Sequence, residues 1–229
     1  MIIPVKERKD KLFGELTPIL KPLGYKLFNT SGDPHYVKET SEFTSFCFFN
    51  FKTGGSIFFS KQSVSIKIIE TIMYDIKLPN NDLSYIDNKK YFLSTVKDTK
   101  TPMMEGNYLA GGYIIDSYED LDKLTEWIRN YFLNEGQAFI DKYSYMPNIL
   151  EEMDRLEAAG KHWAEILCGT VDNVFRGLII SKFCNDGNFK KKILKVDAMI
   201  KGKESLLPWI PYYEKLKTRL ETLAPIYNI

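Results

Sequence analysis

The residues that bind transition metals are few in this chain, and their spacing does not match a ligand set. There are two histidines, His35 and His162, and three cysteines, Cys47, Cys168 and Cys184. No Cys-x-x-Cys or His-x-x-x-His pair occurs, although zinc sites are commonly built from such pairs. The many carboxylates could hold magnesium, but no Asp/Glu spacing singles out a site. We therefore predict no metal site and no cofactor.

Sequence patterns for nucleophilic catalysis and phosphate binding are missing as well. There is no Gly-x-Ser-x-Gly elbow, and a cysteine in an apolar run is typically a small core residue. Gly106, Gly111 and Gly112 have loose P-loop spacing, but no Lys-Ser/Thr follows them and a predicted strand comes next. We expect these glycines to mark a bend or a β-bulge. No catalytic residue is predicted, but an enzyme site assembled from scattered carboxylates and tyrosines stays open.

Charged residues are balanced in number but segregated along the chain. The 31 basic and 30 acidic residues give a net charge of +1, which favours neither nucleic acid nor a membrane as partner. Eleven acids and four bases lie in 116–157, and seven lysines and two aspartates lie in 182–203. Two explanations of the later acids stay open: they recognise a basic partner, or they face the lysine cluster within the fold. These acids are Glu151, Glu152, Asp154 and Glu157.

A phenylalanine-rich segment, 43–51, predicts a strand that is apolar on both faces. Phe46 and Phe48 point to one face of such a strand, whereas Cys47 and Phe49 point to the other. Both faces of the sheet therefore need cover. We expect the N-terminal helix and a helix from Ser117 on one face. The other face is covered by the C-terminal helices, by sheet curvature, by a partner protein or by a ligand in a groove, for which the candidate lining residues are Phe46, Phe48, Tyr91 and Tyr108.

The first two thirds of the chain must supply the sheet that positions these aromatic residues. Leu12, Leu16 and Leu20 recur at helical spacing and predict a helix over 6–21. A good N-cap at Ser117 predicts another helix over 117–141. Residues 75–89 are rich in Asp and Asn and indicate a loop. Short apolar or alternating segments predict strands at 25–29, 35–39, 43–51, 57–59, 64–69, 91–97 and 108–115.

From about residue 145 the strand pattern disappears and apolar residues recur at helical spacing to the end of the chain. The sequence thus predicts an α+β fold: an antiparallel sheet of about five to seven strands, packed by the N-terminal helix and the 117–141 helix, followed by a C-terminal helical segment. We predict a sheet domain over 1–144 and a helical segment over 145–229. One composite domain is the alternative.

Composition is typical of a globular protein in a reducing compartment. Of the 229 residues, 44% are hydrophobic and 27% are charged, which is enough to form a core. The cysteines are odd in number and far apart, a pattern that favours free thiols. The first residues lack the apolar stretch of a signal peptide, and no window approaches a membrane span. We expect a cytoplasmic protein that does not associate with membranes.

The order of a leucine-rich helix, Leu23-Gly24-Tyr25-Lys26 and phenylalanine-rich strands resembles uncharacterised bacterial α+β domains. The resemblance covers residues 6–140. Some of those domains are thought to act as immunity proteins against bacterial toxins, which would imply protein binding without catalysis. The leading hypothesis is therefore a non-enzymatic interaction protein, of the toxin-neutralising kind. The alternatives are a small-molecule binder that uses the aromatic groove, and an enzyme with a carboxylate site.

Overall fold

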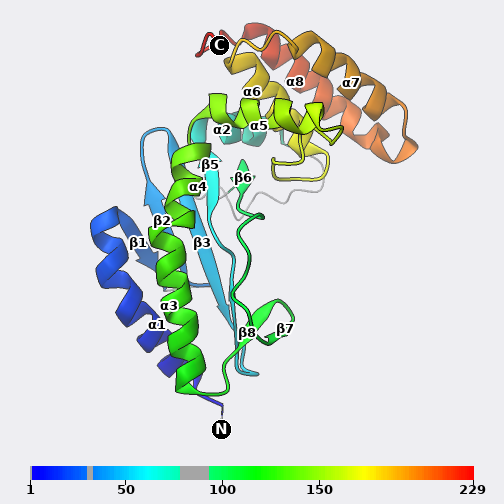
Figure 1. Ribbon diagram of the computed structural model, residues 1–229. Helices are drawn as coiled ribbons and strands as arrows, with labels where there is room; N and C mark the ends of the chain where they lie inside the picture. The colour runs from blue at the N-terminus through cyan, green and yellow to red at the C-terminus, as the bar shows by residue number, and fades with distance from the viewer. Residues whose placement is uncertain (1, 30–32, 78–92) are drawn as a thin grey trace. The chain divides into compact units, whose positions relative to one another are not determined.

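The computed structural model describes residues 2–29, 33–77 and 93–229, which fold into two compact units (Figure 1). Unit 1 comprises residues 1–63 and 98–141, and unit 2 comprises residues 64–97 and 142–229. The sequence prediction placed its boundary between residues 144 and 145. Unit 2 also contains the earlier segment 64–97, so the chain leaves unit 1 and later returns to it.

Unit 1 is built on an antiparallel sheet with the strand order β1-β2-β3-β4-β8-β7. In the centre of this sheet Tyr36 of β2 pairs with Cys47 of β3, and Phe49 of β3 pairs with Phe59 of β4. The predicted α+β class with an antiparallel sheet is confirmed. The strands are β1 (Tyr25–Phe28), β2 (His35–Glu39), β3 (Phe43–Phe51), β4 (Ser56–Phe59), β7 (Tyr108–Leu109) and β8 (Gly112–Ile114).

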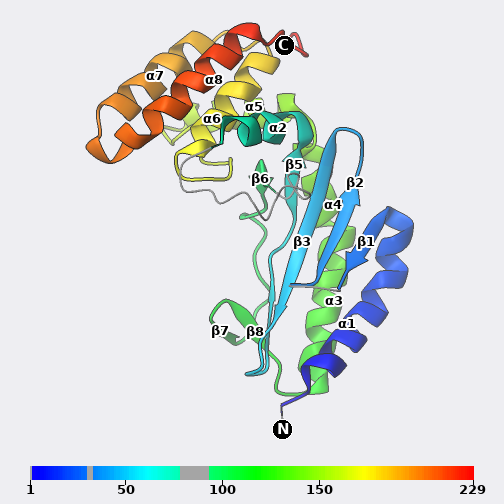
Figure 2. The same ribbon diagram turned by 180° about the vertical axis from the view of Figure 1, so that it is seen from behind.

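Two helices, α1 (Val5–Leu20) and α3 (Tyr118–Leu133), cover one face of this sheet (Figure 2). Phe13 of α1 makes edge-to-face contacts with Phe49 at 5.3 Å and with Tyr36 at 5.9 Å between ring centroids. Phe132 of α3 meets Tyr25 in the same way at 5.3 Å. The two helices were predicted to lie on one face of the sheet and do so, and the aromatic residues of that face form the core of unit 1.

The start of α3 follows the predicted capping pattern. The Ser117 hydroxyl accepts a hydrogen bond from the Asp120 amide and donates one to the Asp120 carboxylate at 2.7 Å. The predicted helix to residue 141 is divided, however. The backbone of Asn134 departs from helical geometry, with φ −118° and ψ −92°, and a second helix, α4 (Glu135–Tyr143), begins directly after it.

The predicted strand over 108–115 is a tight hairpin rather than one strand. Tyr108 pairs with Tyr113, and Leu109 pairs with Gly112. The two residues between them, Ala110 and Gly111, have φ values of 48° and 79°, the backbone of a two-residue hairpin turn. The paired glycines therefore serve a reversal of the chain, where a bend or bulge was predicted.

In unit 2 the predicted strand over 64–69 ends early. Strand β5 (Ser63–Ile66) leads into a helix, α2 (Lys67–Ile76), so the strand prediction for 67–69 is wrong. Ile69, Ile72, Met73 and Ile76 are buried at helical spacing, and this packing overrides the short alternation that precedes it. Of the predicted strand over 91–97, the structure shows β6 (Val96–Lys97); Tyr91 and most of the predicted loop lie outside the described residues.

The C-terminal part of unit 2 is helical, as predicted, and α6 lies at its centre. Phe175, Leu178 and Ile180 of α6 are all fully buried, because α6 packs against α2, α5, α7 and α8. A helix with packing partners on several sides is expected to be mostly apolar, and α6 also buries the charged Arg176. The remaining elements are α5 (Met146–Ala158), α6 (Asp172–Phe183), α7 (Phe189–Lys201), the 3₁₀ helix η4 (Glu204–Trp209) and α8 (Ile210–Thr222).

Within the described ranges, none of the helices combines the length and the apolar composition that a bilayer crossing requires.

Candidate functional site

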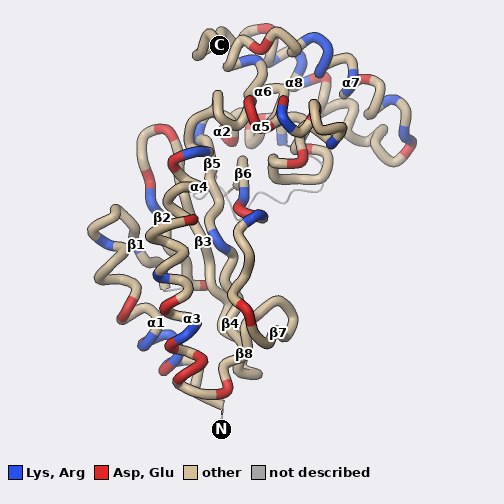
Figure 3. The backbone as a smooth tube through the Cα atoms, in the orientation of Figure 1, with Lys and Arg blue, Asp and Glu red and all other residues tan. Residues whose placement is uncertain are grey.

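Two of the four predicted acidic residues, Asp154 and Glu157, are engaged by lysines of α7 inside unit 2. The Lys192 ammonium donates to Asp154 at 2.8 Å, and Lys195 donates to Glu157, with Lys191 3.8 Å away from the same carboxylate. The hydrogen bond from Lys195 lowers the pKa of Glu157 below its ordinary value. Figure 3 shows the basic positions along α7 and the acidic positions on α5. These two acids therefore match the explanation in which the acidic stretch faces the lysine cluster.

The other two predicted acids, Glu151 and Glu152, differ in environment. Glu152 is buried and receives two hydrogen bonds from Arg155, at 2.7 and 3.0 Å, with Lys142 3.9 Å away. Glu151 is exposed to solvent. Three of the four predicted acidic residues are thus paired with cations of their own unit, and the described residues place no cation beside Glu151.

The charge network of unit 2 has a fully buried lysine at its centre. Lys192 has no exposed side-chain surface, and its ammonium donates to Asp186 and to Asp154 at 2.8 Å each. The ring of Trp163 lies 5.7 Å from the same ammonium. A buried ammonium needs such partners because its desolvation is costly. Lys192 therefore holds α7 to α5 and is not available for a partner.

Three of the predicted groove residues, Phe46, Phe48 and Tyr108, line none of three cavities of 370–450 Å³ that the described residues form. Phe46 is buried, and Phe48 is half-buried and packs on Phe58 at 6.4 Å. Tyr108 lies in the β7–β8 hairpin against Tyr113, at 5.6 Å. Tyr91 lies outside the described residues. The groove between α7 and α8 and the cavity beside Trp127 are lined by other side chains.

A carboxylate and a tyrosine, the groups expected of an enzyme site, meet in a buried polar network in unit 1. Tyr131 donates a hydrogen bond to Asp98 at 2.9 Å and accepts one from the Gln62 amide at 2.8 Å. Burial by itself would raise the pKa of Asp98, but hydrogen bonds from Thr101 and Tyr131 and the nearby charge of Lys61 outweigh burial and lower it. A carboxylate held in its charged form by three kinds of partner is suited to structural anchoring more than to proton transfer.

Among the described residues, few side chains are placed to bind a metal ion or to act as a reactive thiol. No group of three or more His, Cys, Asp or Glu side chains that could hold a metal ion occurs within the described residues. Burial raises the pKa of the Cys168 thiol to about 11 and also raises those of Cys47 and Cys184. Thiols of this kind are protonated at neutral pH and react slowly.

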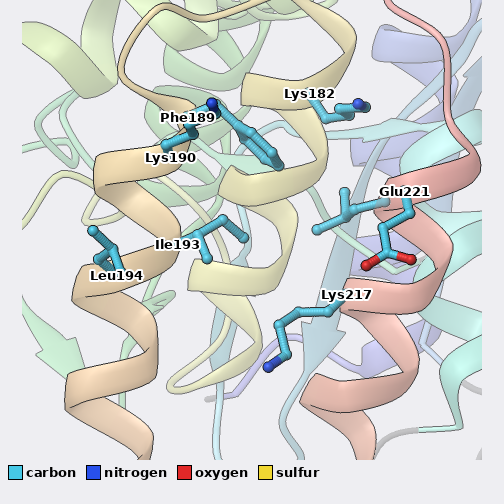
Figure 4. A pocket seen from close by; sticks show the side chains of 8 residues that line it. Lys182, Phe189, Lys190, Ile193, Leu194, Lys217 and Glu221 are labelled. Carbon is cyan, nitrogen blue, oxygen red and sulfur yellow. The ribbon is translucent and has the colours of Figure 1, made fainter.

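The strongest candidate for a binding site is a groove of about 450 Å³ between α7 and α8, with α6 behind it. Figure 4 shows the side chains that line it, with Phe189 and Ile193 of α7 directed into the space. Leu194 is 68% exposed beside them, so it extends the apolar surface of the groove. The lining residues are Lys182, Phe189, Lys190, Ile193, Leu194, Lys217, Leu220 and Glu221.

Two of the three lysines at this groove, Lys182 and Lys190, differ from most other lysines of the same helices. Lys191, Lys192, Lys195, Lys201 and Lys217 each lie within 4 Å of a carboxylate. By contrast, the described residues place no carboxylate within that distance of Lys182 or Lys190. Lys182 lies 5.7 Å from the Phe189 ring. The groove is therefore largely apolar, and two of its three lysines have no carboxylate partner among the described residues.

Sequence reasoning did not find this groove. It predicted only that apolar residues recur at helical spacing after about residue 145, and of Phe189, Ile193 and Val196 on α7 only Val196 is buried. Leu194 is the available signal, because a leucine next to such a face widens the apolar surface beyond what the core needs.

Comparisons with protein-family models, with curated proteins and with solved structures found no match to this chain.

Proposed function

We propose that this protein is a non-enzymatic interaction protein that binds an acidic, amphipathic helix of a partner protein in the groove between α7 and α8. The observation that carries the proposal is the pair of lysines, Lys182 and Lys190, which border an apolar groove without carboxylate partners of their own in the described structure.

The shape of the groove suits a helix. Its walls are two helices, and its lining residues on α7 and α8 recur at intervals of three and four, so they face a common space. An amphipathic helix lays its apolar side chains into a groove of this kind. Covering Leu194 and the exposed parts of Phe189 and Ile193 would remove apolar surface from water, which contributes roughly 25 cal/mol per Å² buried.

The lysines at the groove determine which amphipathic helices can bind there. Carboxylates flanking the apolar face of a partner helix would meet Lys182 and Lys190, whereas lysines or arginines there would be repelled. Glu221, on the α8 side, places one negative charge at the groove against three lysines. The expected partner is therefore acidic, whereas the acidic stretch 116–157 suggested a basic one. Three later members of that stretch, Glu152, Asp154 and Glu157, are paired within unit 2.

A toxin-neutralising role remains part of this proposal. It adds one requirement, that the bound helix belongs to a toxin, and it is supported only by the resemblance of residues 6–140 to immunity domains. The groove lies outside that range.

Fluorescence anisotropy with a labelled model peptide tests the proposal. The probe is a helix of about 18 residues, long enough to be partly helical in water, with leucines at i, i+3, i+4 and i+7 flanked by glutamates. Reversing both charges, Lys182→Glu with Lys190→Glu, should weaken binding about tenfold, equivalent to about 1.4 kcal/mol. Raising the salt concentration should weaken binding to the unmodified protein, because exposed charges are screened.

The matched control is Lys215→Glu on α8, an exposed lysine that does not line the groove. It should leave binding unchanged. A peptide with the same leucines and lysines in place of glutamates should bind much more weakly. Equal binding of the two peptides, or equal effects of the groove and control variants, would contradict the proposal. Binding to anionic vesicles but not to the acidic peptide would assign the groove to a lipid surface instead.

A further inference from the structure

Unit 1 contains a second cavity, of about 370 Å³, that is separate from the groove and has the opposite charge. It lies between the segment 101–105 and the C-terminal half of α3. Its lining combines two aromatic rings, two methionines and two glutamates, without a lysine, arginine or histidine: Thr101, Pro102, Met103, Met104, Glu105, Trp127, Asn130, Tyr131, Asn134 and Glu135.

We propose that this cavity binds a small organic cation, such as a quaternary ammonium group. The indole face of Trp127 and the two carboxylates both attract a cation, and a ring face suits one that is weakly hydrated. A strongly hydrated metal ion would instead require several oxygen ligands at close range.

The aromatic part of the site is Trp127 with Tyr131. Their rings are stacked, with centroids 5.8 Å apart and planes inclined by 16°. Phe59 presses edge-on against both, at 6.0 and 5.5 Å, so the pair is supported from the core. Trp127 is half-buried and contributes to the cavity wall. Indole has the most favourable ring face for a cation.

The electrostatic part is Glu105 with Glu135, both exposed to solvent at the cavity. Across the described ranges neither has a basic residue within ion-pair distance. A buried cation of unit 1, Lys61, donates to the Thr101 carbonyl and acts on Asp98, whose pKa it helps to lower. Its charge is thereby balanced within the buried network, and the cavity itself keeps two negative charges.

The buried network also fixes the geometry of the cavity. Asp98 accepts hydrogen bonds from the amides of Lys100 and Thr101, at 3.1 and 3.0 Å, and from the Tyr131 hydroxyl. It thus ties the start of the 101–105 wall to the aromatic wall on α3. Lys61 has a positive φ of 54°, a conformation that costs energy for a non-glycine residue and persists only where the surroundings hold it. Walls fixed before binding lose less entropy when a ligand arrives.

The test uses choline and its uncharged isostere 3,3-dimethyl-1-butanol, in which carbon replaces nitrogen. Isothermal titration calorimetry of the full chain should give a dissociation constant of about 1 mM for choline. The isostere should bind at least about fivefold more weakly, because it lacks the charge that the ring faces and the carboxylates attract.

Two variants locate the site. Replacing Trp127 with leucine should weaken choline binding about fivefold or more by removing the main ring face. Glu105→Gln combined with Glu135→Gln changes only charge on exposed side chains, so it should fold normally and weaken binding by a similar factor. Glu126→Gln, an exposed carboxylate of α3 that does not line the cavity, is the matched control and should have little effect.

The proposal is overturned if choline does not bind at about 20 mM, well above the expected constant. It is also overturned if choline and the isostere bind equally, or if the charge-neutral double variant binds choline as the control does. Each of these outcomes is independent of the groove on unit 2, because the groove and the cavity share no residue.

Discussion

From the buried network of unit 1 we predict that the substitution Tyr131→Phe destabilises the folded protein. This change removes only a hydroxyl, and Tyr131 is 2% exposed. It leaves the Gln62 amide and one oxygen of the Asp98 carboxylate without the partners that lie 2.8 and 2.9 Å away. A buried group deprived of its hydrogen bond costs about 1–3 kcal/mol. We therefore expect the free energy of unfolding to fall by about 3 kcal/mol.

The same substitution changes the pH dependence of stability. The folded state lowers the pKa of Asp98 below its ordinary value, so Asp98 contributes stability that is present above its unfolded pKa and is lost as the pH falls through the folded one. Without the Tyr131 hydroxyl the folded pKa rises towards the unfolded value, which is about 3.9 for aspartate. The difference in stability between the two proteins should therefore shrink as the pH falls below about 5.

Urea unfolding followed by circular dichroism measures the loss, and hydrogen exchange followed by mass spectrometry localises it. Exchange of the segment that contains the Gln62 amide should accelerate, whereas segments of unit 2 should not change. The matched control is Tyr118→Phe, whose hydroxyl donates to Glu7 at the surface, and it should have little effect. If Tyr131→Phe were no more destabilising than this control, or if its stability showed the same pH dependence as the unmodified protein, the network would not be an anchor.

Three further substitutions or reactions test the buried charges and thiols. Replacing Arg176 with methionine should cost about 3–5 kcal/mol in urea unfolding, because Glu70 loses two hydrogen bonds of 2.9 Å while it remains buried; also replacing Glu70 with leucine should recover most of this loss. Replacing Lys192 with methionine should lower the melting temperature clearly, since its two aspartate partners stay in place, whereas Lys191→Met, at an exposed position, should not. The Cys168 thiol, with its pKa raised to about 11, should react slowly with iodoacetamide at pH 8 and faster after unfolding in urea.

The sheet of unit 1 was predictable because the residue patterns that specify its strands and helices span only a few neighbouring residues. In 43–51 the alternation of Phe46 and Phe48 with Cys47 and Phe49 fixed which residues share a face. The Ser117 cap with Asp120 fixed where α3 begins. Such patterns depend on neighbours within a few residues, and the structure follows them.

The course of the chain through unit 2 was less predictable because two periodicities overlap there. Val64 and Ile66 alternate as in a strand, whereas Ile69, Ile72 and Ile76 recur as in a helix. Because Ile68 continues the alternation of Val64 and Ile66, the predicted strand was extended into residues that form the start of α2. Packing of α2 on α6 decides between them, and that contact joins segments about a hundred residues apart, as the Glu70–Arg176 pair shows.

The candidate sites were not predictable for the same reason. The lysine cluster could be located from the sequence, but which lysines are paired depends on contacts such as Lys195 with Glu157, 38 residues apart. Only after those pairs are assigned do Lys182 and Lys190 stand out. Met104 and Trp127 likewise line one cavity of unit 1 only because the fold brings their two segments together.

The measurement that most directly tests the central claim is a titration of the ¹⁵N-labelled protein with the acidic amphipathic peptide, followed by two-dimensional NMR. We expect the amide shifts to change along the lining of the groove on α7 and α8, centred on Ile193, Leu194 and Leu220. These changes should disappear with Lys182→Glu combined with Lys190→Glu. Shifts confined to unit 1, the same changes with the basic peptide, or no changes at all would contradict it.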